Sequence, residues 1–142
     1  MKVELVRVDD GFHFEATGSS EIKVHTDASP AIGGQNAGVR PMELLLMGVG
    51  SCSAIDVVLI LKKQRQEVTD FRISVEGNRV KEENTERSPF HSVNIHYFFK
   101  GKNLDRAKIE RAVKLSMEKY CSATAQFEPL AQITHEITIE EV

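Results

Sequence analysis

The segment MELLLMGVGSCSAIDVVLILKK, residues 42–63, is a nearly unbroken apolar run that holds one cysteine, Cys52. Its length raises the question of a membrane span, because about 20 apolar residues suffice to cross a bilayer. The run also contains Glu43, Asp56 and helix-weakening glycines, which disfavour the interior of a bilayer. We therefore predict that this segment is a core helix and that the protein does not enter a membrane.

The predicted helix begins at Pro41, which lacks a backbone N–H and suits the first turn of a helix. A carboxylate such as Glu43 is favoured in that turn by the unpaired N–H groups and the helix dipole. Charged residues become frequent only after Leu61, so we expect the first half of the helix to be covered on all sides. Such a helix needs a sheet around it, together with a second subunit.

Length and composition are those of one globular domain, residues 1–142, with a formal net charge of −3. Because Lys and Arg are scattered along the chain, no basic face predicts a nucleic-acid partner. The first ten residues, MKVELVRVDD, are polar and charged, with no apolar signal region, so we expect a cytoplasmic protein. In that compartment two cysteines do not form a structural disulfide framework.

Alternating apolar and polar residues predict strands on both sides of the helix. The first two strands surround the turn Asp9-Asp10-Gly11 and form a hairpin. A second helix begins near Leu104 and delivers Cys121 at its C-terminal end. The order of strands, helix, strand pair, helix and strand is typical of an α+β fold. The predicted strands are residues 2–8, 12–16, 21–26, 71–80, 91–99 and 133–140.

Cys52 lies among small residues that would let a substrate approach its sulfur. An apolar environment alone raises the pKa of a thiol, so a reactive cysteine here needs a cation nearby. Arg40 is one candidate, in a loop (residues 27–41) rich in turn residues that we expect to be mobile or ordered by a partner. A single cysteine in an apolar helix is more often an inert buried residue, and the residues alone leave both interpretations open.

Other common kinds of site find little support in the sequence. The separation of Cys52 and Cys121 fits no CxxC spacing of zinc or thioredoxin-like sites, so this pair meets only through the fold. The five histidines show no metal-ligand spacing. The chain has neither a Gly-rich phosphate loop after a strand nor a Gly-x-Ser-x-Gly motif, so we expect no nucleotide, metal or other cofactor.

The string RPMELLLMGVGSCSAIDVVLILKKQRQ, followed later in the chain by MEKYCSATA, resembles the OsmC/Ohr family, and more narrowly its OsmC-like branch of organic hydroperoxide thiol peroxidases. The resemblance covers nearly the full chain. It implies a fold in which antiparallel sheets wrap around two long central helices in an intertwined homodimer, with each active site near the subunit interface.

The resemblance also implies the chemistry. The cysteine matching Cys52 is the peroxidatic residue, which attacks an organic hydroperoxide, releases an alcohol and is left as a sulfenic acid. The cysteine matching Cys121 resolves that sulfenic acid as an intramolecular disulfide. A dithiol or lipoyl-type reductant then restores both thiols.

Glu43 matches the glutamate of the family's Pro-x-Glu motif, which pairs with an arginine that steadies the reactive thiolate. The best-studied relatives place that arginine in the first hairpin, where this chain has the turn VDDG. Arg40, beside the motif, and Arg7, just upstream of the turn, are therefore the two candidates. An arginine close to sulfur favours the thiolate over the thiol.

The leading hypothesis is a thiol-dependent peroxidase that reduces organic hydroperoxides in oxidative stress defence. The alternative is a non-catalytic dimeric module that senses redox state or binds a hydrophobic ligand beside Cys52. A purely structural role for both cysteines is the third interpretation.

Overall fold

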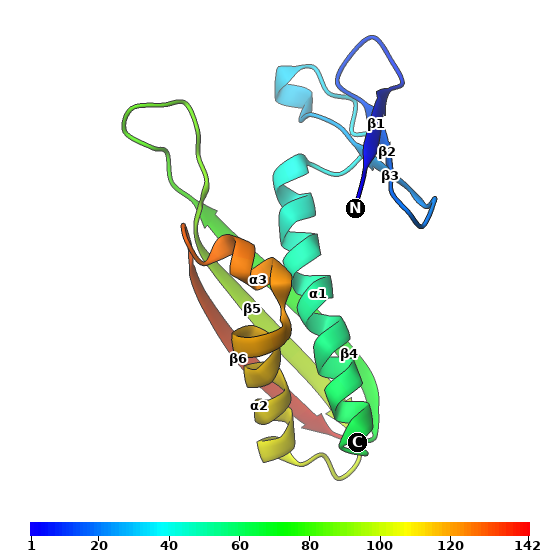
Figure 1. Ribbon diagram of the computed structural model, residues 1–142, viewed down its shortest axis with the longest axis vertical. Helices are drawn as coiled ribbons and strands as arrows, with labels where there is room; N and C mark the ends of the chain where they lie inside the picture. The colour runs from blue at the N-terminus through cyan, green and yellow to red at the C-terminus, as the bar shows by residue number, and fades with distance from the viewer. The chain divides into compact units, whose positions relative to one another are not determined.

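The structure is a computed structural model that describes residues 1–142, and it divides into two compact units, Met1–Leu45 and Leu46–Val142. Each unit contains its own three-stranded sheet. Figure 1 shows the helices and strands along the chain. The α+β class predicted from the sequence is confirmed by this set of elements.

The N-terminal unit is an antiparallel meander in the order β1-β2-β3. Its first turn is the predicted one, because Oδ1 of Asp9 accepts hydrogen bonds from the N–H groups of Gly11 (2.8 Å) and His13 (3.3 Å). Arg7 closes the same turn, where its guanidinium donates to the backbone carbonyls of Asp9 (2.9 Å) and Asp10 (2.6 Å). The elements are β1 (Glu4–Arg7), β2 (Phe14–Thr17), β3 (Lys23–Thr26) and a 3-10 turn (Pro30–Ile32).

The loop that follows is held by one buried carboxylate, that of Asp27. Its oxygens accept hydrogen bonds from the N–H groups of Ala28 (2.8 Å), Gln35 (2.9 Å) and Ala37 (3.1 Å). The bond from Ala37, followed by that from Gln35, holds the pKa of Asp27 below its ordinary value. A single side chain thus joins backbone donors from separate parts of the loop, and the expectation that the loop is mobile or ordered by a partner stays a prediction.

The C-terminal unit contains a mixed sheet in the order β4-β5-β6. Strand β5 is antiparallel to β4 but parallel to β6, so the prediction of purely antiparallel sheets was wrong for the last strand. The segment between β5 and β6 is helical, and such a crossover returns the chain to the end of the sheet from which it left. Helix α1 (Pro41–Lys63) begins in the N-terminal unit and continues into this one. The elements that follow are β4 (Val68–Arg79), β5 (Phe90–Gly101), α2 (Arg106–Leu115), a π-helix (Ser116–Tyr120), α3 (Ser122–Phe127) and β6 (Gln132–Glu141).

The core of the C-terminal unit lies between this sheet and its helices. On β5 alternate side chains point inward, as the period of two requires, and the ring of Phe71 on β4 stacks on Phe99 with 4.7 Å between centroids. Helix α2 is amphipathic, with Asp105 as its N-cap accepting from two backbone N–H groups. The buried core side chains include Val93, Ile95, Tyr97, Phe99, Ile109, Ala112 and Val113.

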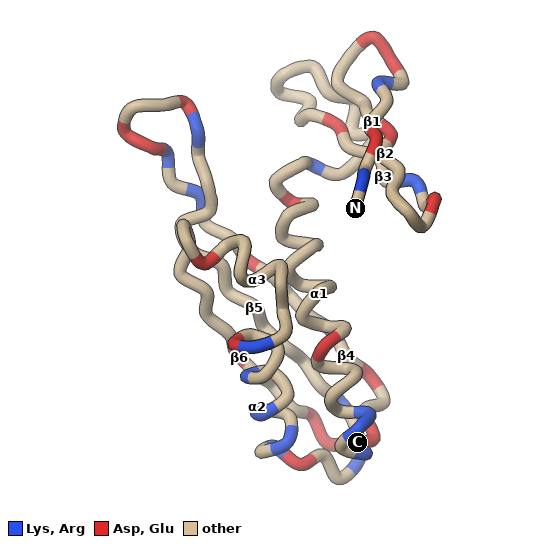
Figure 2. The backbone as a smooth tube through the Cα atoms, in the orientation of Figure 1, with Lys and Arg blue, Asp and Glu red and all other residues tan.

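Helix α1 buries only one stripe within a single chain, at spacings of about four residues that follow the helical period. Its other sides carry exposed apolar side chains, and Figure 2 shows that charges are sparse between its ends. By length and composition it could cross a membrane, with a mean hydropathy of 2.3 over 18 residues, of which 28% are buried. The buried residues are Val49, Gly50, Ser53, Val57 and Leu61, and the exposed apolar ones are Leu45, Met47, Ile55, Val58 and Leu59.

Two expectations about α1 involve a second subunit and stay predictions. Within one chain the first half of α1 is not covered on all sides, because the sheet reaches one stripe only. One chain also supplies one long helix, since α2 ends at Leu115. A second long central helix would have to come from a second subunit.

Gly50 lets α1 approach β4 closely. A Cβ atom at this position would lie 2.8 Å from Cγ2 of Val75, closer than side-chain carbons pack. A Cβ atom at Gly48, also in α1, would meet nothing within 4 Å. The two glycines therefore provide a matched pair of helix positions with different surroundings.

We predict that Gly50→Ala lowers the free energy of unfolding by about 1–3 kcal/mol through overpacking against Val75. Gly48→Ala is expected to raise it by up to about 1 kcal/mol, since alanine has the higher helix propensity. Urea denaturation followed by circular dichroism measures both changes. Val75→Ala combined with Gly50→Ala should recover most of the loss, and equal effects of the two alanine variants would contradict the close approach.

Candidate redox site

The structure brings Cys52 and Cys121 together in the C-terminal unit, although they are far apart in the sequence. Cys52 is half-buried on α1, whereas Cys121 is buried, with 5% of its surface exposed, between the π-helix and α3. Cys52 contributes to the pKa of Cys121 through a hydrogen bond between the two side chains and through the negative charge of its thiolate. The pair is thus adjacent, with the more accessible cysteine on α1.

The environment of Cys121 disfavours its thiolate. Burial is the largest cause that raises the pKa of Cys121, and the neighbouring Cys52 raises it further. Thr124 partly offsets this, because its hydroxyl (3.0 Å) and its N–H (3.4 Å) both donate to the sulfur. The net pKa is raised, so Cys121 is held mainly as a thiol at neutral pH.

The backbone that carries Cys121 is a π-helix, which the sequence did not predict. The N–H of Cys121 donates to the carbonyl of Ser116 at 2.8 Å, a bond that spans five residues instead of four. Such a turn contains one more residue than an α-helical turn and is frequent at functional sites. It sets the position at which Cys121 leaves the helix.

A buried chain of polar side chains lies beside the cysteine pair. The Ser53 hydroxyl contacts the hydroxyl of Tyr97 at 2.6 Å and that of Ser116 at 2.8 Å. Ser116 also donates to Oδ2 of Asp56 at 3.1 Å, and the Tyr97 hydroxyl lies 3.3 Å from Sδ of Met117. We call Tyr97, Ser53, Ser116 and Asp56 the buried hydroxyl chain. Sequence reasoning missed it, although a serine next to the cysteine of an apolar helix was a usable signal.

Burial raises the pKa of Tyr97 to about 12, and the charges of Cys121 and Asp56 act in the same direction. The hydrogen bond with Ser53 acts against them. Tyr97 is therefore protonated at neutral pH and available as a donor. Its coupling to Cys121 places the buried hydroxyl chain next to the redox pair.

The other predicted site residues belong to the N-terminal unit. Arg40 donates to the backbone carbonyl of Gly38 at 3.1 Å and also hydrogen-bonds the side chain of Asn36. Arg40 and the exposed Glu43 line the same open groove. Arg7 is engaged by the carbonyls of its own turn. A role for these residues in activating Cys52 stays a prediction.

Two histidines that the sequence left isolated are neighbours in the N-terminal unit. Nε2 of His13 and Nδ1 of His25 are 2.7 Å apart, and Glu15 lies 3.8 Å from the ring of His25. They meet because β2 pairs with β3, which aligns Glu15 with His25. No group of three or more His, Cys, Asp and Glu side chains is arranged to hold a metal ion.

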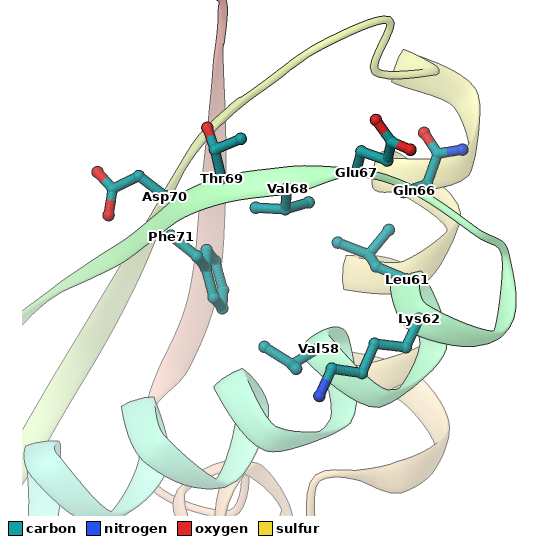
Figure 3. A pocket seen from close by; sticks show the side chains of 9 residues that line it. All are labelled: Val58, Leu61, Lys62, Gln66, Glu67, Val68, Thr69, Asp70 and Phe71. Carbon is teal, nitrogen blue, oxygen red and sulfur yellow. The ribbon is translucent and has the colours of Figure 1, made fainter.

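Two cavities of about 370 Å³ open on the C-terminal unit. Figure 3 shows the first, where Val58 on α1 faces Phe71 on β4; neither cysteine lines it. The second is lined by apolar side chains such as Leu59 and Leu115 together with Asp56. Neither cysteine lines the second cavity, but Asp56 follows Cys52 by four residues, one helical turn, so this cavity lies on the side of α1 that carries Cys52.

Removing the hydroxyl of Thr124 is expected to raise the pKa of Cys121 still further, because the thiolate loses a donor. The comparison is made in a Cys52→Ser background, where Cys121 is the only thiol. Alkylation by iodoacetamide as a function of pH gives the pKa. Thr124→Val should shift the profile to higher pH and Thr124→Ser should leave it in place; identical profiles for both would contradict the assignment.

Comparison with known proteins shows to which family the chain is related. The family model described as OsmC-like protein matches residues 34–136. Protein YhfA of Escherichia coli strain K12 is 44% identical over 97 residues, which cover 67% of this chain and 69% of YhfA. A solved structure of a hypothetical protein from Aquifex aeolicus VF5 is 35% identical, with a TM-score of 0.77 over 98% of this chain and 96% of that one. The organic hydroperoxide resistance protein OhrB of Bacillus subtilis, 20% identical, has the same fold, with a TM-score of 0.65 over 96% of each chain.

Proposed function

Because the chain belongs to the OsmC-like protein family, we propose that it is a thiol-dependent peroxidase that reduces organic hydroperoxides to alcohols. The observation that carries this proposal is the contact between the half-buried Cys52 and the buried Cys121. Two adjacent thiols of unequal exposure suit a pair in which one attacks a substrate and the other closes a disulfide.

In the first step the Cys52 thiolate attacks the terminal oxygen of the hydroperoxide. An S–O bond forms, the O–O bond breaks, and the alkoxide that leaves takes a proton to become the alcohol. Cys52 is oxidised to a sulfenic acid and the hydroperoxide is reduced. The greater exposure of Cys52 supports this order, since substrate reaches it more readily than Cys121.

In the second step Cys121 attacks the sulfur of the sulfenic acid. The S–S bond forms, the S–O bond breaks, and the hydroxyl group leaves as water with the proton of the Cys121 thiol. A dithiol reductant of lipoyl type then exchanges with the disulfide and restores both thiols. The raised pKa of Cys121 suits this second role, because it keeps Cys121 a thiol while Cys52 reacts.

The cavity beside Asp56 supports an organic substrate, because apolar side chains such as Leu59 and Leu115 form part of its wall. The name of the Bacillus subtilis relative, an organic hydroperoxide resistance protein, supports the same substrate class. Glu43 and an arginine, Arg40 or Arg7, are proposed to stabilise the Cys52 thiolate. We place the protein in the cytoplasm, where reducing pools keep thiols ready, and assign it to oxidative stress defence.

We also propose a homodimer, built on the exposed apolar side of α1. An exposed apolar helix face of this kind is characteristic of an interface. A second copy of α1 would bury it and supply the second central helix that the chain lacks.

One equivalent of cumene hydroperoxide should convert both thiols of the wild-type protein to an intramolecular disulfide, as shown by thiol counting and mass analysis. Cys121→Ser should stop at a sulfenic acid on Cys52 that dimedone traps. Cys52→Ser should consume hydroperoxide only at the background rate. Two unreacted thiols in the wild-type protein would overturn the proposal and favour a non-catalytic module.

The dimer is tested by placing a charge on the exposed face of α1. Ile55, 69% exposed in one chain, is changed to Asp, and Leu130, 68% exposed and outside α1, provides the matched control. Sedimentation should give a dimer for the wild-type protein and for Leu130→Asp, and a monomer for Ile55→Asp. A wild-type monomer, or a dimer that survives Ile55→Asp, would contradict an interface on this face.

A further inference from the structure

We propose that the buried hydroxyl chain is a positioning device that holds Cys121 within bonding distance of Cys52, with Tyr97 as its anchor on the sheet. The chain touches neither a substrate nor the reacting atoms through a hydrogen bond, so its members are positioning residues. The proposal deepens the proposed function, because it concerns the resolving step at the same pair. Its main test needs no peroxide and therefore stands apart from the peroxidase assay.

The buried hydroxyl chain connects the two segments that carry the cysteines. Ser53 is the residue after Cys52 on α1, and Ser116 supplies the carbonyl that accepts the N–H of Cys121 at 2.8 Å. The hydroxyls of Ser53 and Ser116 lie 2.8 Å apart. The two segments are thus joined by side chains one residue after Cys52 and five residues before Cys121, in the interior of the unit.

The hydrogen bonds of the chain have one direction. Each hydroxyl of the chain has one proton to donate, and an ionised Asp56 can only accept. The three contacts between these four residues all receive a proton in one arrangement only, from Tyr97 to Ser53, from Ser53 to Ser116, and from Ser116 to Asp56. In that arrangement the proton of Tyr97 goes to Ser53 and not to Sδ of Met117. A tyrosine that stays protonated thus stands at one end and a carboxylate at the other.

The hydroxyls of the chain are shielded from solvent. Tyr97, Ser53 and Ser116 are each 0% exposed, so water does not replace a lost partner. A buried hydroxyl that loses its partner is costly, and the surrounding backbone shifts to relieve it. Here that backbone is the π-helix. Its hydrogen bond from the N–H of Cys121 to the carbonyl of Ser116 sets the position of the resolving thiol.

The expected effect is a weaker disulfide and not merely a less stable protein. Tyr97→Phe keeps the aromatic ring in the core but removes the donor to Ser53. With the two segments less well aligned, the effective concentration of Cys121 toward Cys52 should fall about tenfold. A tenfold change in the equilibrium of a two-electron couple is about 30 mV, toward a more easily reduced disulfide.

The test equilibrates each protein with dithiothreitol redox buffers and measures the fraction of disulfide by alkylation and mass analysis. Tyr97→Phe should raise the reduction potential by about 30 mV relative to the wild-type protein. Tyr120→Phe is the matched control, because it removes the hydroxyl of an exposed tyrosine beside Cys121 that is not in the chain. Its potential should equal that of the wild-type protein.

A second pair of variants changes Asp56, at the other end of the chain, so that the test does not depend on whether Tyr97→Phe folds. Asp56 is half-buried, and Asp56→Asn keeps an oxygen that accepts from Ser116 whereas Asp56→Ala does not. We expect the reduction potential of Asp56→Asn to be near the wild-type value. The potential of Asp56→Ala should rise, as for Tyr97→Phe. A purely structural role would lower the unfolding free energy without this order of potentials.

Stopped-flow oxidation gives the kinetic counterpart. In a Cys121→Ser background, Tyr97→Phe should leave the rate of sulfenic acid formation on Cys52 unchanged, whereas with both cysteines present it should slow disulfide closure. Wild-type potentials for both Tyr97→Phe and Asp56→Ala would overturn the proposal. So would a shift of equal size in Tyr120→Phe.

Discussion

Ser53 is the contact point on which the site depends. It lies on the buried stripe of α1, and its hydroxyl reaches β5 through Tyr97 and the start of the π-helix through Ser116. These three elements come from distant parts of the sequence, and the three side chains that join them are fully buried. The positions of Cys52, one residue before Ser53, and of Cys121, bonded through its N–H to Ser116, follow from this junction.

The two sides of α1 have different surroundings. One stripe is packed on the sheet, as closely as the absent side chain of Gly50 permits, and the rest of its apolar surface has no cover within one chain. A helix that is apolar all round is normally buried all round. The composition of α1 therefore makes sense for a protein whose core is completed by a second copy, which is why the dimer is part of the proposed function.

The two thiols differ because their surroundings differ. Cys121 is buried beside Thr124 and its pKa is raised, mainly by desolvation. Cys52 is on the more open side of the pair. No lysine or arginine is among the groups that shift the pKa of Cys121.

Local patterns in the sequence were sufficient for much of this protein. Alternation predicted the strands, Pro41 marked the start of the long helix, and two cysteine motifs identified the family, because each of these features depends on neighbouring residues. The parallel pairing of β6, the π-helix before Cys121 and the buried hydroxyl chain were not predicted. The pairing of β6 and the buried hydroxyl chain depend on contacts between residues far apart in the chain, which only the tertiary structure brings within hydrogen-bonding distance. The π-helix is itself a local turn, but its first residue, Ser116, contacts Ser53 and Asp56 on α1, more than fifty residues earlier.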